Sequence, residues 1–312
     1  VASMLFLDYS REDGEWEPNE FGGRENLDAI VFLKEMNEAV YKNFPNVQTI
    51  AEESTSFPQV SGPVFSGGLG FGMKWMMGWM HDTLEYFQKE SIYRKYHPND
   101  LTFSMTYAFT ENFMLPLSHD EVVYGKKSIQ SKLIGDEWQR FANLRLLYGY
   151  MFTHPGTKLL FMGSEFGQSS EWNFAGSLDW NLLEFDFHSG VKKCITDLNA
   201  LYKNNPALYE KQFSPEGFEW INYSDHQNSV LAYIRKGINE KKNLIVVCNM
   251  TPFVHTKYRI GLPQKGKLTQ IFNSDSVEYG GSGITNLKTV KIEKELWNGR
   301  EFSAEIVLPP LG

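Results

Sequence analysis

Two short apolar runs in this sequence are each followed by residues that can act on a glycosidic bond. Glu52 comes directly after the run Val47–Ala51, and His119 and Asp120 follow the run Phe113–Leu117. Reaction at the anomeric carbon of a sugar needs converging carboxyl groups, of which one donates a proton and another stabilises positive charge. Glu52, His119 and Asp120 are therefore candidate catalytic residues, provided that the fold brings the two strand ends together.

Glu52 and Asp120 also have purely structural explanations. A single Glu after a strand is usually a solvated loop carboxylate. Ser118 and Asp120 are both good N-caps for a helix that begins near residue 119. Two carboxylate-bearing strand ends in one parallel sheet favour the catalytic interpretation, but the pattern alone leaves both explanations open.

The other motifs exclude several kinds of site. The glycine-rich segment Gly67–Gly72 lacks both the dinucleotide spacing and the Lys-Ser/Thr of a P-loop, so we interpret it as a conformational loop. The seven His residues form no close ligand cluster, and there is no Gly-x-Ser-x-Gly nucleophile elbow. We therefore expect no metal and no other cofactor. Cys194 and Cys248 are far apart and match no metal-ligand spacing, which favours a reduced, cytoplasmic setting.

The elements that would position the candidates alternate between short apolar runs and helical segments. This alternation, with polar residues at the carboxyl ends of the runs, predicts parallel β/α units. A TIM-type barrel places its chemistry at that end of its strands. The apolar runs are Val1–Tyr9, Val47–Ala51, Phe113–Leu117 and Lys158–Met162, and the helical segments are Asn26–Phe44, Glu137–Phe152 and Val191–Tyr202.

The pattern changes at about Gly217. From there on, short runs rich in β-branched and aromatic residues are separated by turn residues, without helical periodicity. This pattern predicts a separate antiparallel domain, a sandwich or a small barrel. The runs are Phe218–Asn222, Ser229–Arg235, Asn243–Asn249, Tyr258–Ile260, Leu268–Phe272 and Phe302–Leu308.

Composition limits the partners. The formal net charge is −8, and no Lys/Arg run overrules it, so we expect no nucleic acid, whereas a neutral polymer is compatible. Aromatic residues make up 15% of the chain, and although most serve the core, such rings also stack on sugars. No apolar run approaches membrane-spanning length, so we expect no membrane partner.

Several longer motifs extend along essentially the whole chain in colinear order. They are Asp8–Arg11, Pro18–Asn26, Ala51–Thr55, Gly78–Thr83, Leu117–Val123, Gly125–Ser128, Phe161–Gly163 and Ser177–Trp180. Together they resemble the 1,4-α-glucan (glycogen or starch) branching enzymes of the α-amylase family. Glu52, His119 and Asp120 are generic to that wider family, whereas Asn19–Asn26 and Gly78–Thr83 are much narrower and carry the resemblance to branching enzymes.

The resemblance implies a role for each candidate. Glu52 matches the general acid/base, Asp120 the second carboxylate that distorts the sugar and stabilises the transition state, and His119 the neighbour that hydrogen-bonds glucosyl hydroxyls. The family's nucleophilic Asp lies in Arg-x-Asp-Ala-Val-Ala-Ser-Met. Val1 aligns with the first Val of that string, so we expect the nucleophile two residues before Val1.

The resemblance also implies the architecture. Residues 1–212 should form the C-terminal half of a catalytic (β/α)8 barrel, and residues 213–312 an all-β antiparallel C-terminal domain that lacks the family's last strand. Trp172 and Trp180, at a barrel-loop position, are candidates for substrate binding, with loop packing as the alternative. Gly72 and Tyr124 stand where relatives often carry an aromatic residue and a His, a difference that could affect glucan contacts.

The implied activity is glucan branching. The whole protein would cleave an α-1,4-glucan such as glycogen, amylose or amylopectin with retention, and transfer the chain to a 6-hydroxyl. Its further partner would be the missing N-terminal half of its own barrel, and we expect the isolated 312 residues to be inactive. The expected location is cytoplasmic, or plastidial in a plant. Two alternatives stay open: another α-amylase-family hydrolase or transferase, and a non-catalytic glucan-binding fragment.

Overall fold

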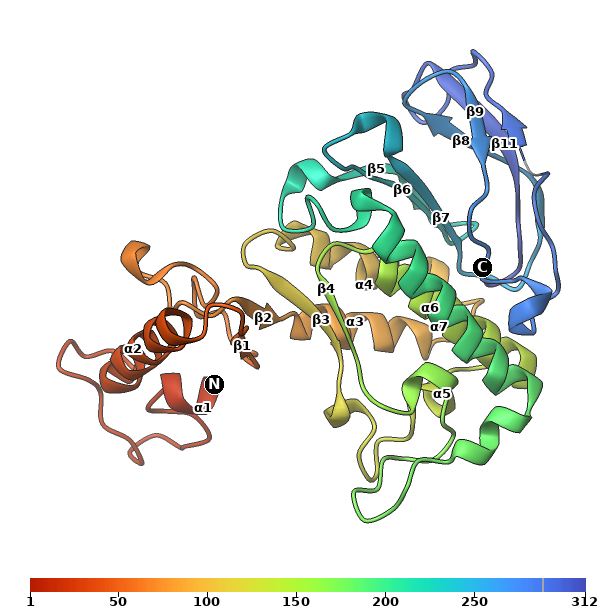
Figure 1. Ribbon diagram of the computed structural model, residues 1–312. Helices are drawn as coiled ribbons and strands as arrows, with labels where there is room; N and C mark the ends of the chain where they lie inside the picture. The colour runs from red at the N-terminus through yellow and green to blue at the C-terminus, as the bar shows by residue number, and fades with distance from the viewer. Residues whose placement is uncertain (288) are drawn as a thin grey trace.

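The computed structural model describes residues 1–287 and 289–312 (Figure 1). Its centre is a parallel sheet of four strands in chain order, β1 (Ile50–Ala51), β2 (Met73–Trp75), β3 (Phe113–Leu117) and β4 (Thr157–Leu160). Because every neighbouring pair is parallel, the carboxyl ends of all four strands lie at the same edge of the sheet.

Helices alternate with these strands, as the sequence predicts for β/α units. α2 (Leu27–Asn43) precedes β1, α3 (Met77–Phe87) follows β2, α6 (Glu137–Thr153) lies between β3 and β4, and α7 (Asp186–Asn204) follows β4. The shorter helices α1 (Ala2–Leu5), α4 (Asn99–Thr102) and α5 (Ile129–Lys132) lie in the connections.

The N-termini of the two 17-residue helices are set by local polar groups. The side chain of Asn26 accepts a hydrogen bond from the backbone N–H of Ala29 at 3.1 Å and so caps α2. Asp136 and Gln139 form a reciprocal capping box at the start of α6. Each cap satisfies backbone donors that have no partner within the helix.

The sheet differs from the sequence prediction in one strand. The apolar run Val1–Tyr9 does not form a strand of the sheet, and it contains α1 and a single bridge between Phe6 and Glu25. The fourth strand of the sheet is instead β2, which pairs with β1 and β3 through Lys74. Three residues with a lysine in the middle are too short and too polar to show the alternation of a strand.

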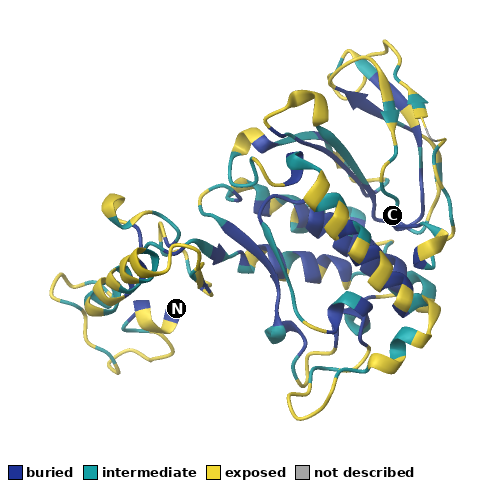
Figure 2. Cartoon of the chain, in the orientation of Figure 1, coloured by how far each residue is buried: buried dark blue, intermediate teal, exposed yellow. Residues whose placement is uncertain are grey.

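The two ends of the sheet contribute to different hydrophobic cores, β3 to one and β1 to the other. The larger core packs α3, α6 and α7 together and includes Trp79, Leu115 and Tyr148. A smaller core around α2 includes Leu33 and Ala51. Figure 2 shows that α2 is largely exposed, whereas α6 is mostly buried.

In the C-terminal part, every strand pairing among the described residues is antiparallel, which confirms the predicted all-β character. One sheet contains β5 (Phe218–Asp225), β6 (Val230–Arg235) and β7 (Leu244–Asn249). Two pairs accompany it, β8 (His255–Leu262) with β11 (Phe302–Leu308), and β9 (Lys267–Thr269) with β10 (Thr289–Lys291). In Figure 1 these sheets lie beyond α6 and α7, on the far side from α2.

Three buried arginines connect the antiparallel part to the helices. Arg94 donates to the carbonyl oxygen of Met250 at 2.9 Å, Arg145 to that of Ser274 at 2.8 Å, and Arg235 to that of Thr153 at 2.6 Å. The delocalised guanidinium is less strongly hydrated than an ammonium, which makes arginine suited to such buried contacts. Within the residues described above, no helix has the length and apolar character needed to cross a membrane.

Candidate active site

Glu52 occupies the position immediately after β1. Its side chain is exposed, whereas the side chain of Glu53 is 1% exposed and accepts a hydrogen bond from the N–H of Thr55 at 2.6 Å. Successive side chains in an extended segment point to opposite faces, so only one of the two carboxylates can face the solvent at this edge. Of this pair, Glu52 is the one available to a substrate.

His119 and Asp120 lie in a short 3-10 helix, η4 (His119–Glu121), immediately after β3. Ser118 is the N-cap of η4, and its own N–H and O–H both donate to the Glu121 carboxylate, at 2.6 and 2.8 Å. The structural role that the sequence allowed for Asp120 as a cap is thus filled by Ser118. The Asp120 carboxylate is 44% exposed and lies 3.2 Å from Nε2 of His119.

The order of the sheet places the two candidate sites at one edge. β1 and β3 are both neighbours of β2, so Glu52 and Asp120 follow strands that are separated by one intervening strand. Adjacent strands are about 4.8 Å apart, which puts the two backbones on the order of 10 Å from each other. Carboxylate side chains extending from such positions can reach the two sides of a single glucosyl ring.

Trp172 packs beside the proposed catalytic histidine. Its ring lies edge-on at 6.2 Å from the ring of His119 and at 5.0 Å from that of Phe161. The backbone N–H of Trp172 donates to the carbonyl oxygen of Val122 at 2.8 Å. Two loops from different strands therefore meet at His119.

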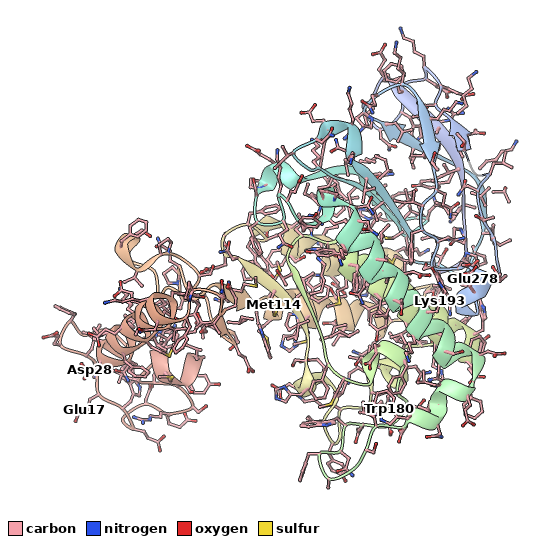
Figure 3. All side chains as sticks on the ribbon, viewed as in Figure 1. Glu17, Asp28, Met114, Trp180, Lys193 and Glu278 are labelled. Carbon is pink, nitrogen blue, oxygen red and sulfur yellow. The ribbon has the colours of Figure 1, made fainter. Side chains whose placement is uncertain are left out.

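Trp180 is supported differently. It is 52% exposed, and its ring lies 5.3 Å from that of Phe166. Figure 3 places it among the loops that follow β3 and β4. Of the two tryptophans that the sequence nominated for substrate binding, Trp172 touches a candidate catalytic residue, whereas Trp180 packs on Phe166.

Lys74, in β2, pairs with Ala51, the residue before the proposed acid/base, and no sequence pattern assigned it a role. It is 6% exposed and donates from Nζ to the carbonyl oxygen of Thr55 at 2.8 Å. Burial lowers the pKa of its ammonium group, and the negative charges of Glu53 and Glu111 act in the opposite direction. Lys74 thus ties the loop after Glu52 to the central strand β2. A lysine inside an otherwise apolar run, Met73–Met77, was the available signal.

The start of the chain also lies at this loop, because the amino group of Val1 donates to the carbonyl oxygen of Glu52 at 2.7 Å.

Among residues 1–287 and 289–312, no group of three or more His, Cys, Asp or Glu side chains is arranged to hold a metal ion.

Comparison with known proteins identifies the C-terminal part first. Residues 220–312 match the family described as "Alpha amylase, C-terminal all-beta domain". Over 311 residues, all of this chain, the sequence is 58% identical to the 1,4-alpha-glucan branching enzyme GlgB of Aquifex aeolicus and 57% identical to that of Nitrosococcus oceani. The resemblance to the branching enzymes is confirmed. The chain covers 49% and 41% of these two proteins, so it spans about half the length of the curated relatives it matches.

Solved structures confirm the fold class. The alpha-amylase from H.orenii superimposes with a TM-score of 0.58 at 15% identity, covering 95% of this chain and 57% of its own. A cyclomaltodextrinase gives 0.55 at 16% identity, covering 90% of this chain and 42% of its own. The chain therefore has the predicted architecture, part of a TIM-type barrel followed by an all-β domain.

Proposed function

We propose that this chain is part of a 1,4-α-glucan branching enzyme and contributes two of its catalytic carboxylates. The observation that supports this most strongly is the placement of Glu52 and Asp120 at one edge of a parallel sheet, in a chain 58% identical end to end to a relative of that name. The proposed substrate is an α-1,4-linked glucan such as glycogen, amylose or amylopectin. This is a neutral polymer compatible with a net charge of −8.

Glu52 acts as the general acid and then as the general base. In the first step it protonates the oxygen of the scissile α-1,4 bond, and in the second it removes the proton from the 6-hydroxyl of the acceptor chain. Its exposure at the strand end lets it serve both steps, because the leaving chain and the acceptor approach from the solvent side.

Asp120 stabilises the positive charge that develops on the sugar ring, and His119 donates hydrogen bonds to glucosyl hydroxyls. The contact at 3.2 Å between the two side chains orients His119, and the rings of Phe161 and Trp172 hold it from the other sides. Retention of configuration also requires a nucleophilic carboxylate about 5–5.5 Å from the acid/base. We assign that role to no residue of this chain, and the matching relatives are about twice as long.

Hydrolysis is the competing function, because the same carboxylates serve hydrolases with this fold. The solved structures that share the fold are an alpha-amylase and a cyclomaltodextrinase, at 15% and 16% identity. The 58% identity to the Aquifex aeolicus protein favours transfer over hydrolysis. The two functions are distinguished by their products. Branching creates α-1,6 linkages, whereas hydrolysis creates new reducing ends without any α-1,6 linkage.

The test is a chimera in which this chain replaces the matching portion of the Aquifex aeolicus protein. Incubated with amylose, the chimera should form α-1,6 branch points. Glu52→Gln should remove most of this activity and leave glucan binding intact, because it eliminates the proton donor with little change of shape. Glu184→Gln, at an exposed position in η6 (Trp180–Glu184), is the matched control. A chimera that only hydrolyses amylose would refute branching, and full activity in the Glu52→Gln variant would refute the site.

Two further parts of the proposal concern organisation and location. We place the domain boundary between residues 212 and 213. These residues lie in the connection between the end of α7 at Asn204 and the start of β5 at Phe218. A cytoplasmic location is supported by Cys194 and Cys248, which are both free and buried, as expected in a reducing compartment.

A further inference from the structure

The loop from Val122 to Ser128, which follows the catalytic helix η4, is exposed and yet held in a specific conformation. Tyr124 in this loop is 93% exposed. Lys127 has a φ of 65°, a left-handed conformation that costs a residue with a side chain about 1–2 kcal/mol. Such conformations persist where the surroundings impose them, and they are concentrated at ligand-binding sites.

Glu171, which lies in the loop after β4, accepts hydrogen bonds from two backbone N–H groups of the Val122–Ser128 loop. One carboxylate oxygen accepts the backbone N–H of Lys127 at 2.7 Å, and the other accepts that of Gly125 at 3.0 Å. These hydrogen bonds, that from Lys127 before that from Gly125, lower the pKa of the Glu171 carboxyl. Glu171 therefore bridges two loops that are more than 40 residues apart in sequence.

Lys132, in α5, donates hydrogen bonds to two backbone carbonyl groups of the same loop. Its ammonium group donates to the carbonyl oxygens of Lys126 and Lys127, the latter at 3.1 Å. The short turn is thus bound through its N–H groups by one side chain and through its carbonyl groups by another. The burial of Tyr124 cannot be the reason for this arrangement, because its side chain lies almost entirely in solvent.

The Val122–Ser128 loop, which Glu171 and Lys132 hold in place, adjoins the candidate active site. Trp172, the neighbour of Glu171, donates its backbone N–H to Val122 and packs its ring against His119. Tyr124 is four residues from Asp120 along the chain. Displacement of Glu171 would therefore loosen the loop without removing a residue that touches the reacting sugar.

We propose that Glu171 is a positioning residue, and that the loop it fixes presents Tyr124 as a stacking platform for the α-glucan chain next to the reacting glucosyl unit. The substrate class rests on the proposed function. A flat aromatic ring can cover the apolar face of a sugar. Holding that ring ready before binding saves the cost of ordering a mobile loop when the glucan arrives.

The test uses the chimera in which this chain replaces the matching portion of the Aquifex aeolicus protein, with hydrogen exchange of the Gly125 and Lys127 amides and maltoheptaose titration as readouts. Glu171→Gln keeps the size of the side chain but turns an NH2 group toward one of the two backbone donors. We expect the exchange of both amides to accelerate at least tenfold and the Kd for maltoheptaose to rise about five- to tenfold. Glu184→Gln should change neither quantity.

The platform is tested separately. Tyr124→Ala should weaken maltoheptaose binding to the same extent as Glu171→Gln, whereas Tyr124→Phe, which keeps the ring, should bind like the unmodified chimera. Because Tyr124 is exposed, neither substitution should lower the melting temperature.

Each part of the inference can fail independently of the proposed function. Unchanged amide exchange in the Glu171→Gln variant would overturn the proposal that Glu171 fixes the loop. Undiminished binding by Tyr124→Ala, in a chimera that does bind maltoheptaose, would overturn the platform and leave the branching proposal standing. An unmodified chimera that binds no maltoheptaose would overturn the platform and count against the glucan substrate itself.

Discussion

Replacing Arg235 with methionine should destabilise the junction between the barrel helices and the antiparallel part. Arg235 is 0% exposed and donates to three backbone carbonyl oxygens, those of Thr153 at 2.6 Å, Leu208 at 3.1 Å and Gly217 at 3.2 Å. Burial lowers the pKa of its guanidinium group to about 10, so it is charged at neutral pH.

The expected cost follows from the carbonyl groups that lose their partner. A buried polar group left without a hydrogen bond costs about 1–3 kcal/mol, so three such groups set a range of about 3–9 kcal/mol. Methionine fills most of the volume, and the desolvation of a charge is no longer required, which moves the result to the lower part of that range. We predict that Arg235→Met lowers the free energy of unfolding by about 3–5 kcal/mol.

Urea unfolding followed by tryptophan fluorescence and circular dichroism measures this difference. Lys236→Met is the matched control, because the neighbouring Lys236 makes a partly exposed ion pair with Glu219 that should be worth about 1 kcal/mol or less. The reasoning would be refuted if Arg235→Met cost no more than the control. Two separate unfolding transitions in the variant would show in addition that Arg235 couples the two parts.

Three other substitutions test particular contacts. Burial lowers the pKa of His154 to about 3, well below the ordinary histidine value of 6.5, so the unfolded chain binds more protons between these values and stability must fall as the pH falls. The slope is about 1.4 kcal/mol per pH unit well below 6.5, and urea unfolding at pH 7 and pH 5 should show a loss of about 2 kcal/mol that is absent from His154→Asn. Ser118→Ala removes the cap of η4 and should cost about 1 kcal/mol; an unchanged urea midpoint would contradict the cap. Gly190→Ala places a methyl group 2.6 Å from the backbone of Tyr279 and should lower stability by about 1–3 kcal/mol, whereas Gly176→Ala, whose nearest neighbour is 3.7 Å away, should have little effect in the same assay.

The sequence predicted elements well where the pattern was long or strongly apolar. The strand Phe113–Leu117 and the helices α2 and α6 occur close to the expected bounds, whereas α7 begins at Asp186 and not at Val191. β3 was recognisable as a continuous apolar run, all of which is buried, and α2 as a helix with apolar residues on one side. β2 could not be predicted, since its three residues are defined by pairing with β1 and β3 and not by their own composition. The prediction for Val1–Tyr9 was wrong, because an apolar run alone does not distinguish a strand from a short helix.

The candidate site was predictable in its residues but not in its supports. Glu52 and Asp120 follow strands, and that position can be read directly from the chain. The burial of Glu53, the tie from Lys74 to Thr55 and the bridge from Glu171 to Lys127 join residues that no local pattern relates. Such contacts depend on how two loops meet at the edge of the sheet, which a single sequence does not specify.

The most direct test of the central claim is the count of α-1,6 linkages formed from amylose by the chimera with the Aquifex aeolicus protein, with and without Glu52→Gln. The proposed roles predict branch points with the unmodified sequence and a loss of roughly a hundredfold or more with the variant, since general acid–base catalysis contributes about 10²–10⁴-fold. Maltoheptaose binding should be retained in both proteins. Equal branching by the two proteins would contradict the assignment of Glu52, and an absence of α-1,6 linkages from both, with amylose nevertheless cleaved, would contradict branching itself.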